Sequence, residues 1–546
     1  MVALLVALFG CSPSLPAGDE GRPDIIFVSI DTLRADHLST YGYERPTSPF
    51  FDQLAHDGTR FEQARSSSPW TLPAHTTMFT GLLPSSHQVV DDNLRLDESI
   101  PVLAETMSEA GYRTGGFVST LYVSTLFGFE RGFENFEDFG IHTEKKNLRG
   151  EVVAEDVVDS ALSWWQKQPA GEPVFLFLHL YDVHYTYDPP APFETLFDRA
   201  PDDDDRRYKN YFHFLKKPLD SEEFEHQIAQ YDEAIRYVDT QLQRLDAAAR
   251  TAERGVRWVI TSDHGEEFGE RGSWGHAHTL YAEQLHIPLI VSGPGLPEAR
   301  VVEGSVGSHD LAPTIASWAD SEMTGDGMDL GGPLDGNPIA DRPLVAETTR
   351  FSTNRLSILE DGLRLEWDLK HRKRQLYDVR EDPGESNDIA RSRPEDVTRL
   401  ARRIETLLGQ PWQAGTAGTV TTDGIILRQG RQKKLTVEDG DRFQVLPYDA
   451  QVWFSPRGET PAPTATSEKS PSDARLGPWQ ANGGDRPGAD APLQVDASGT
   501  AQIEMDEATR AQLEALGYLQ EAEPDETIDA TEGQQGPAQT DPDPGP

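Results

Sequence analysis

Three short runs of almost entirely apolar residues constrain the fold of this 546-residue chain more than any other sequence feature. They are DIIFVSID (24–31), VFLFLHLYD (174–182) and VRWVITSDHG (256–265). Runs of this kind are typical of strands that are buried on both faces of a parallel sheet. Amphipathic stretches that favour helices lie between them, at 48–61, 100–112 and 226–250. This alternation predicts an α/β fold with a mostly parallel central sheet flanked by helices.

The rest of the chain predicts smaller units that follow an α/β domain at residues 22–345. Shorter strands and one helix at 346–410 predict a C-terminal subdomain, and residues 411–455 predict a small β unit. Residues 456–546 are rich in Pro, Gly, Ala, Ser and Asp. This composition predicts a linker and a disordered acidic tail, with a short helix at 506–520.

The charge balance and the single cysteine exclude several classes of protein. The chain has 49 Lys and Arg against 92 Asp and Glu, a net charge of −43. Nucleic-acid binding needs clustered cationic side chains to neutralise phosphates, so we expect no nucleic-acid partner. One cysteine excludes an intramolecular disulfide and a cysteine-based zinc site.

That cysteine, Cys11, follows the apolar run MVALLVALFG. The run is too short to cross a bilayer but suits the apolar part of a signal peptide. The residues LFGC resemble the acylation site of bacterial lipoproteins, although no Lys or Arg precedes them. We therefore expect an exported protein, anchored to a bacterial membrane by a lipid on Cys11 and facing the periplasm or the exterior. The alternative is an ordinary secretory leader.

Acidic and histidine residues lie at the ends of all three runs. They are Asp31 at the end of the first run, Asp182 and then His184 at the end of the second, and Asp263 and His264 near the end of the third. Ligands of open parallel sheets bind beyond the carboxyl ends of the strands. Mixed oxygen and nitrogen donors there predict a divalent cation, either calcium, manganese, magnesium or zinc. The alternative for each Asp is a helix N-cap.

Two further segments carry candidate catalytic residues. In TLPAH (71–75), Pro73 predicts that Thr71 starts a helix, where free amide groups stabilise an anion. Thr71 is then a candidate nucleophile if a metal lowers the pKa of its hydroxyl, and His75 lies one turn further on. The alternative for Thr71 is a simple N-cap.

His276 and His278 lie on a Gly-rich loop. They are candidates for metal ligands or proton donors, and the alternative is that they are solvated loop residues.

Together these segments resemble the sulfatase family of the alkaline phosphatase superfamily. The matching pieces occur in order between about residue 23 and residue 390, namely PDIIFVSIDTLRADHLSTYGY, TLPAHTTMFTG, FLHLYDVHYTYDPP, TSDHGEEFGE, YAEQLHIPLIVSGPG and QLYDVREDPGESNDIA. The later QLEALGYL segment resembles the tails of bacterial sulfatase-like lipoproteins and exported proteins.

The resemblance implies a role for each matching residue. Asp31, Asp263 and His264 correspond to metal ligands, and Thr71 corresponds to the nucleophile. His184 corresponds to a substrate-binding or general-acid histidine, and His276 or His278 to the group beside the leaving oxygen. The remaining candidates are His75, at the position of a supporting Arg, and Asn93 and Asp182 as substrate contacts. Two-metal relatives need further ligands, for which the candidates are Asp182, Asp232, His276, His278 and His309, but we favour one metal.

Two departures from the family pattern restrict which reaction mechanism the protein can use. The usual core, C/S-x-P-x-R, reads Thr71-Leu72-Pro73-Ala74-His75, and Thr32 replaces the second of two adjacent Asp residues. Oxidation of a threonine cannot yield an aldehyde, so we expect no formylglycine. We predict a metal-dependent hydrolase of sulfate or phosphate esters on a small molecule, glycan or lipid. The alternatives are a phosphoryl or phospho-headgroup transferase of the same superfamily and a catalytically inactive binding protein.

Overall fold

The computed structural model describes residues 22–140, 152–198, 221–250, 254–339, 342–350 and 354–408, strand segments between 410 and 456, and residues 500–502. These residues belong to a compact unit that ends at Glu504. The predictions for Cys11 and for the helix at 506–520 lie outside the described residues. None of the described helices is long and apolar enough to cross a membrane.

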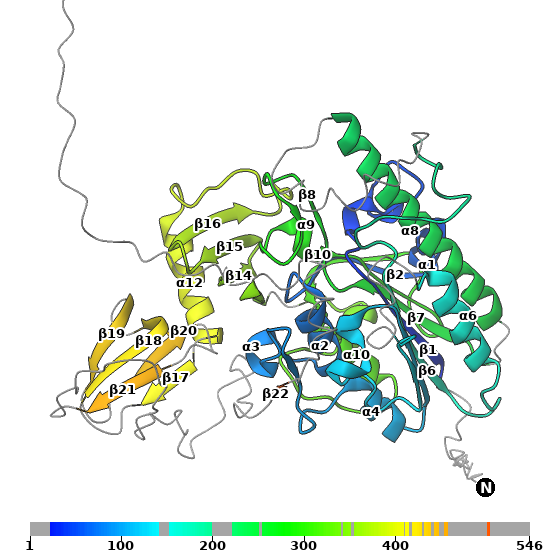
Figure 1. The fold of residues 1–546 in the computed structure, drawn as a ribbon, viewed down its shortest axis with the longest axis horizontal. Coiled ribbons are helices and arrows are strands. Elements are labelled where there is room, and N and C mark those ends of the chain that lie inside the picture. The colour runs from blue at the N-terminus through cyan, green and yellow to red at the C-terminus, as the bar shows by residue number, and fades with distance from the viewer. Residues whose placement is uncertain are drawn as a thin grey trace, which may run out of the picture. The chain divides into compact units, whose positions relative to one another are not determined.

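A nine-stranded sheet forms the centre of the fold, in the order β10-β2-β11-β7-β1-β6-β4-β5, with β12 beside β2 (Figure 1). Its strands are β1 (Asp24–Ile30), β2 (Gly58–Arg65), β4 (Arg113–Val118), β5 (Asn135–Glu137), β6 (Val174–Leu180), β7 (Val256–Ser262), β10 (His286–Ile287), β11 (Leu289–Ser292) and β12 (Arg300–Gly307). Strand β1 pairs in parallel with β6 and β7, whereas β11 runs antiparallel to β7 and β2. The three apolar runs are therefore adjacent central strands, which confirms the predicted fold class.

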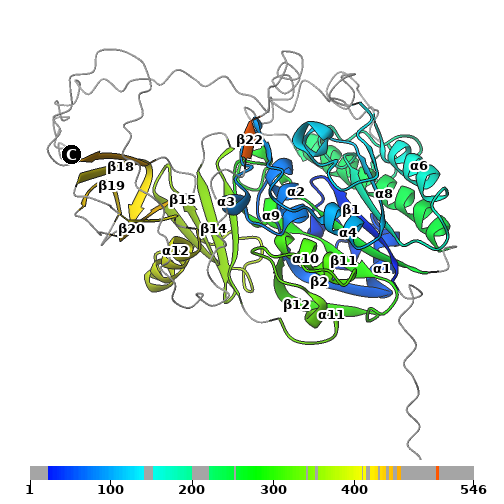
Figure 2. The same ribbon diagram turned by 90° about the horizontal axis from the view of Figure 1, so that it is seen from below.

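Helices cover both faces of this sheet (Figures 1 and 2). Helices α1 (Pro49–His56) and α6 (Ala154–Trp165) both contact α8 (Ser221–Ala249), and the three lie on one face. Helices α2 (Thr71–Thr80), α4 (Leu103–Glu109) and α10 (Leu311–Ser317) form a second group on the other face. Shorter helices are α3 (Pro84–His87), α9 (Ala282–Leu285) and α11 (Gly331–Leu334).

Successive side chains of strand β1 point to opposite faces of the sheet, so they contact the two helix layers in turn. Ile26, Val28 and Ile30 belong to the core that includes residues of α1, α6 and α8. On the other face, Phe27 contacts Phe177 of β6, with ring centroids 5.3 Å apart. This face also carries Ser29, so it presents a polar position to α2 close to the end of the strand.

The amphipathic stretch at 48–61 predicts one helix, and this prediction is wrong for its last residues. Helix α1 ends at His56, and residues from Gly58 onward form β2. At Gly58, a β-carbon would lie only 2.3 Å from the carbonyl oxygen of Val291 on β11. Glycine therefore allows the two strands to pair closely at this position.

A second, antiparallel sheet follows the nine-stranded sheet along the chain. It contains β13 (Leu344–Thr348), β14 (Arg355–Glu360), β15 (Leu363–Asp368) and β16 (Lys373–Asp378). Helix α12 (Pro394–Leu408) contacts β14, β15 and β16, and buries Leu400, Ala401 and Ile404. A five-stranded sheet contains β17 (Gln410–Gln413), β18 (Gly418–Leu427), β19 (Arg431–Val437), β20 (Arg442–Leu446) and β21 (Val452–Pro456). Strand β22 (Thr500–Gln502) pairs with β3 (Leu94–Leu96).

Candidate active site

The residues that follow β1 and β7 meet at one edge of the central sheet. Ile30 is in register with Leu180 and with Ser262, so the three parallel strands end at the same level. Beyond these ends, His264 Nε2 lies 3.8 Å from Asp31 Oδ1 and 3.3 Å from Asp263 Oδ2. All three side chains are fully buried. The structure thus brings together the three predicted metal ligands.

His179, on β6, is a fourth member of this cluster that we did not predict. Its Nε2 lies 3.3 Å from Asp31 Oδ2, and it forms a potential metal-binding group with His75 and Asp263. The signal was present in the sequence, because His179 is the only polar residue within the apolar run VFLFLHL. A strand buried on both faces rarely contains a histidine without a specific partner.

The donor atoms of this cluster fit a divalent cation. Among the described residues, no hydrogen-bond partner is found for Oδ1 and Oδ2 of Asp31, Oδ2 of Asp263, or either ring nitrogen of His179. His264 Nδ1 lies 2.9 Å from the carbonyl oxygen of Gly265 and donates to it, which leaves Nε2 as a lone-pair donor. Buried carboxylate oxygens without a hydrogen bond are costly, and a bound cation would remove this cost.

The pKa values of the two carboxylates reflect their crowding. Burial, and then the charge of Asp263, raise the pKa of Asp31 well above its ordinary value. Burial also opposes the ionisation of Asp263, but the neighbouring His264, together with the hydrogen bond from the His264 N–H, outweighs burial and lowers the pKa of Asp263. Two carboxylates this close favour a cation between them, since a cation stabilises both in the ionised form.

Thr71 lies at the start of α2, beside the cluster. Trp70 is the N-cap and Thr71 the first helical residue, so its side chain does not serve as the N-cap. Its Oγ1 is 3.4 Å from His264 Nε2. A hydroxyl at this position lies next to the candidate cation site and at the amino end of a helix, where negative charge is stabilised.

His75 lies beneath Thr71 and is completely buried. Its Nδ1 donates to the carbonyl oxygen of Thr71 at 2.9 Å, and its Nε2 is 2.9 Å from the hydroxyl of Ser29. Burial lowers the pKa of His75 to about 3, so the ring is neutral. Both nitrogens are therefore occupied, and His75 anchors the first turn of α2 to β1.

His276 is the histidine of the Gly-rich loop that lies beside the cluster. Its ring centroid is 4.5 Å from that of His264 and 5.0 Å from that of His184. Its Nδ1 is 2.9 Å from the carboxylate of buried Glu266, a partner that we did not predict. Burial, and then His264, lower the pKa of His276 well below its ordinary value.

His278 faces the short hairpin formed by β8 (Glu267–Phe268) and β9 (Trp274–Gly275). Its Nε2 lies 3.1 Å from Glu267 and 2.8 Å from Ser273, and its Nδ1 donates to the carbonyl oxygen of His276. Burial opposes its protonation, but Glu267 outweighs burial and raises the pKa of His278. Both of its nitrogens have partners away from Thr71.

The structure separates His184 from Asp182, which follows the same strand. The ring of His184 stacks on Tyr181 at 4.3 Å, beside His276, and burial lowers its pKa to about 3. Asp182 instead accepts the N–H of Ala154 at 3.0 Å, at the start of α6. Asp182 therefore contacts the first turn of that helix.

The other predicted candidates have partners elsewhere. Asp232 bonds to His37 and Arg45, and His309 lies 3.3 Å from Arg342. Asn93 is exposed in a turn before β3. Within the part of the chain that the structure describes, the only groups that could hold a metal share Asp263 and form one cluster.

Comparisons with known proteins identify relatives of this chain. A family model described as Sulfatase matches residues 23–321. The chain is 24% identical over 345 residues to the uncharacterized sulfatase YidJ of Escherichia coli, covering 55% of this chain and 68% of the relative. It is 21% identical over 418 residues to the Delta 4,5-hexuronate-2-O-sulfatase of Bacteroides thetaiotaomicron, covering 68% and 85%.

Two solved structures share the fold. One is a protein in complex with its substrate D-glucosamine-2-N,6-O-disulfate, with a TM-score of 0.60 and 17% identity over 70% of this chain and 97% of that chain. The other is a phosphonate monoester hydrolase of Silicibacter pomeroyi, with a TM-score of 0.58 and 22% identity over 70% and 94%.

Proposed function

Because the chain belongs to the sulfatase family, and is therefore an ester hydrolase, we propose that it cleaves sulfate or phosphate esters with Thr71 as the nucleophile. The observation that carries this proposal is the position of Thr71 Oγ1, 3.4 Å from His264 Nε2 at the start of α2. Asp31, Asp263 and His264 would hold a divalent cation beside it. The cation would supply charge neutralisation for the hydroxyl oxygen and for an oxygen of the ester.

The proposed reaction has two steps. Thr71 loses its hydroxyl proton to solvent, and its Oγ attacks the sulfur or phosphorus while the bond to the leaving oxygen breaks. His276 gives a proton to the leaving alkoxide. Water then attacks the Thr71 ester and transfers a proton to His276. The bond to Oγ breaks, Oγ takes up a proton from solvent, and the inorganic acid leaves.

Glu266 gives His276 the geometry for this role. Its carboxylate accepts the Nδ1 proton, so that Nε2 is the atom that exchanges protons with the substrate. His276 is neutral in the free protein, and an anionic substrate beside it favours the protonated form. In this proposal His184, whose ring centroid lies 5.0 Å from that of His276, would hydrogen-bond to the same substrate.

Replacing Glu266 tests this arrangement. We expect Glu266→Gln to lower kcat by roughly 10- to 100-fold. The side-chain amide is a weaker hydrogen-bond acceptor than the carboxylate, so it no longer fixes the ring of His276. Steady-state kinetics and metal analysis measure the effect, and the metal content should not change. Full activity would show that His276 does not depend on Glu266.

The function is tested with the full chain and a panel of esters. After chelation, 4-nitrophenyl sulfate, 4-nitrophenyl phosphate, bis(4-nitrophenyl) phosphate and phenyl 4-nitrophenylphosphonate are assayed with calcium, manganese, magnesium or zinc added back. We expect cation-dependent turnover, with a phosphate or phosphonate ester preferred, because Thr71 cannot supply a formylglycine. Intact-peptide mass spectrometry should find Thr71 unmodified.

The panel also separates the alternatives. Preference for the sulfate ester with unmodified Thr71 would contradict the expected selectivity but retain the nucleophile. Transfer to an added alcohol in place of water would indicate a transferase. The absence of turnover with every ester and cation would contradict the proposed hydrolysis.

A further inference from the structure

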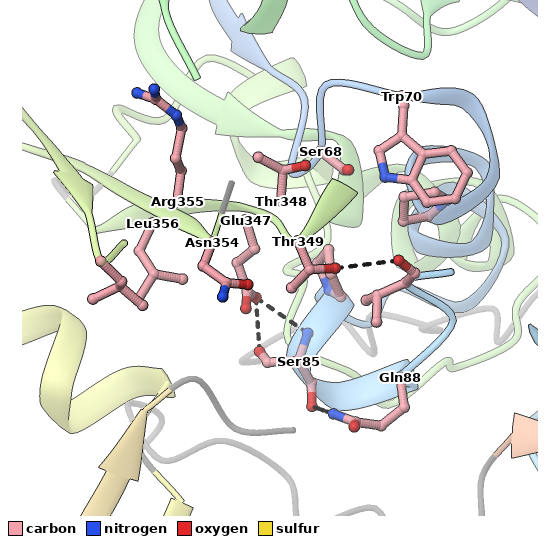
Figure 3. Close-up of a pocket in the computed structure, with 14 residues that line it drawn as sticks. Ser68, Trp70, Ser85, Gln88, Glu347, Thr348, Thr349, Asn354, Arg355 and Leu356 are labelled. Carbon is pink, nitrogen blue, oxygen red and sulfur yellow. Dashed lines mark hydrogen bonds between the residues drawn. The ribbon is translucent and has the colours of Figure 1, made fainter. Parts of the chain in front are cut away.

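The last two residues of β13 connect the segment before α2, which leads to Thr71, with the loop that carries His276. The N–H of Glu347 donates to the carbonyl oxygen of Ser67 at 2.9 Å. The hydroxyl of Thr348 donates to the carbonyl oxygen of Ala277 at 3.2 Å. Figure 3 shows Glu347, Thr348, Ser68 and Trp70 among the residues that line one pocket. The antiparallel sheet thus reaches the candidate active site through its first strand.

Arg350 extends this connection to the residue before the nucleophile. Its guanidinium carbon lies 4.1 Å from the centroid of the Trp70 ring. The same guanidinium donates to the hydroxyl of Tyr122 at 3.1 Å and pairs with Asp92 at 3.1 Å. Its side chain is only 5% exposed, so these contacts are shielded from water. A desolvated guanidinium over an indole ring is a favourable and directional contact.

Trp70 depends on such packing for its position. It is the N-cap of α2, and no side-chain hydrogen bond caps this helix end. The ring is held by Arg350 on its face and by Tyr122 in an edge-on contact at 5.6 Å. The orientation of the first turn of α2, which contains Thr71, therefore depends on the packing of this ring.

We infer that Arg350 is a positioning residue, which fixes Trp70 and through it the placement of Thr71 relative to His276. This inference rests on the proposed function of Thr71. The charge of Arg350 is already compensated by Asp92, which favours a positioning role over the capture of an anionic substrate group. The backbone bond from Ala277 N–H to the carbonyl oxygen of Pro69, at 2.9 Å, joins the same two loops.

The test compares Arg350→Met and Arg350→Lys with a matched control, Arg355→Met. Arg355 lies on β14 and pairs with Glu366 at 2.6 Å and with Asp368 at 3.3 Å; among the described residues, the guanidinium that lies over the Trp70 ring is that of Arg350 and not that of Arg355. We expect Arg350→Met to lower kcat by about 10- to 100-fold, with KM changed less than about twofold, because a small displacement of a reacting group costs this much. Arg350→Lys should recover part of the rate, and Arg355→Met should leave kcat unchanged.

Hydrogen exchange provides a readout that does not depend on turnover. In Arg350→Met, peptides that cover 66–78 and 274–279 should exchange faster, while the same peptides are unchanged in Arg355→Met. If Arg350→Met fails to fold, Arg350→Lys and Asp92→Asn are measured in the same way, with smaller changes in the same direction expected.

Three results would overturn the inference that Arg350 positions Thr71. A raised KM with kcat retained would overturn the inference, because it would place Arg350 in contact with substrate. Equal losses in the Arg355 control, or unchanged exchange at 66–78, would also overturn it. If Thr71 is not the nucleophile, the Thr71→Ala variant will still turn over substrate. The hydrogen-exchange measurement on the Arg350 variants does not use that variant, so the two failures can be distinguished.

Discussion

Thr71→Ala is expected to lower kcat by at least about 10³-fold, because it removes the oxygen that would form the covalent ester. The content of bound metal should stay unchanged, since Asp31, Asp263 and His264 are retained. Alanine also fits the first turn of α2, so the fold should be preserved. Steady-state kinetics on the preferred ester, together with elemental analysis of the purified protein, would measure both quantities.

Two other threonine variants serve as comparisons for Thr71→Ala. Thr71→Ser keeps a hydroxyl at the same position and should keep a measurable part of the activity. Thr76→Ala removes a buried hydroxyl from the same helix, where it donates to the carbonyl oxygen of Leu72, and should leave kcat close to that of the parent. If Thr71→Ala turns over substrate at the parental rate, the nucleophile lies elsewhere.

Asp263→Asn is expected to lose metal and activity together. Asp263 belongs to both groups of residues that could hold a cation, and its Oδ2 lies 3.3 Å from His264 Nε2. Its Oδ1 accepts the N–H groups of Thr32 and His264, at 3.2 Å and 2.9 Å. An amide can keep these two bonds but removes the negative charge, so we expect at least about a 10-fold weaker metal affinity and about a 10²-fold lower kcat.

Asp239→Asn is the matched control for this substitution. Asp239 is also a buried aspartate of the same domain, but its carboxylate accepts the N–H groups of Phe50 and Phe51 at the start of α1. The control should keep its metal and its kcat. If Asp263→Asn retained full metal content and full activity, the cation would have to be held by other residues.

The sequence by itself determined the central architecture. The apolar runs predicted β1, β6 and β7, because strands that are covered on both faces consist mostly of apolar side chains. Parallel pairing then places their carboxyl ends at one edge, so Asp31, Asp263 and His264 were expected to meet there. Local spacing also placed Thr71 at the start of α2.

The partners of the remaining polar residues were decided only by the tertiary structure. Asp182 and His184 follow the same strand, yet one bonds to α6 and the other lies beside His276. His276 and His278 are two positions apart, yet only His276 faces the cluster, because the hairpin carrying Glu267 engages His278.

Contacts between residues far apart in the chain carry the least sequence signal. His179 approaches Asp31 across two paired strands, and Arg350 reaches Trp70 from beyond β13. Hydrophobic periodicity records which face of an element is buried, and it does not record which side chain lies opposite. The sequence therefore determined the sheet and the residues at its edge, whereas tertiary packing decided which of the buried polar groups act on one another.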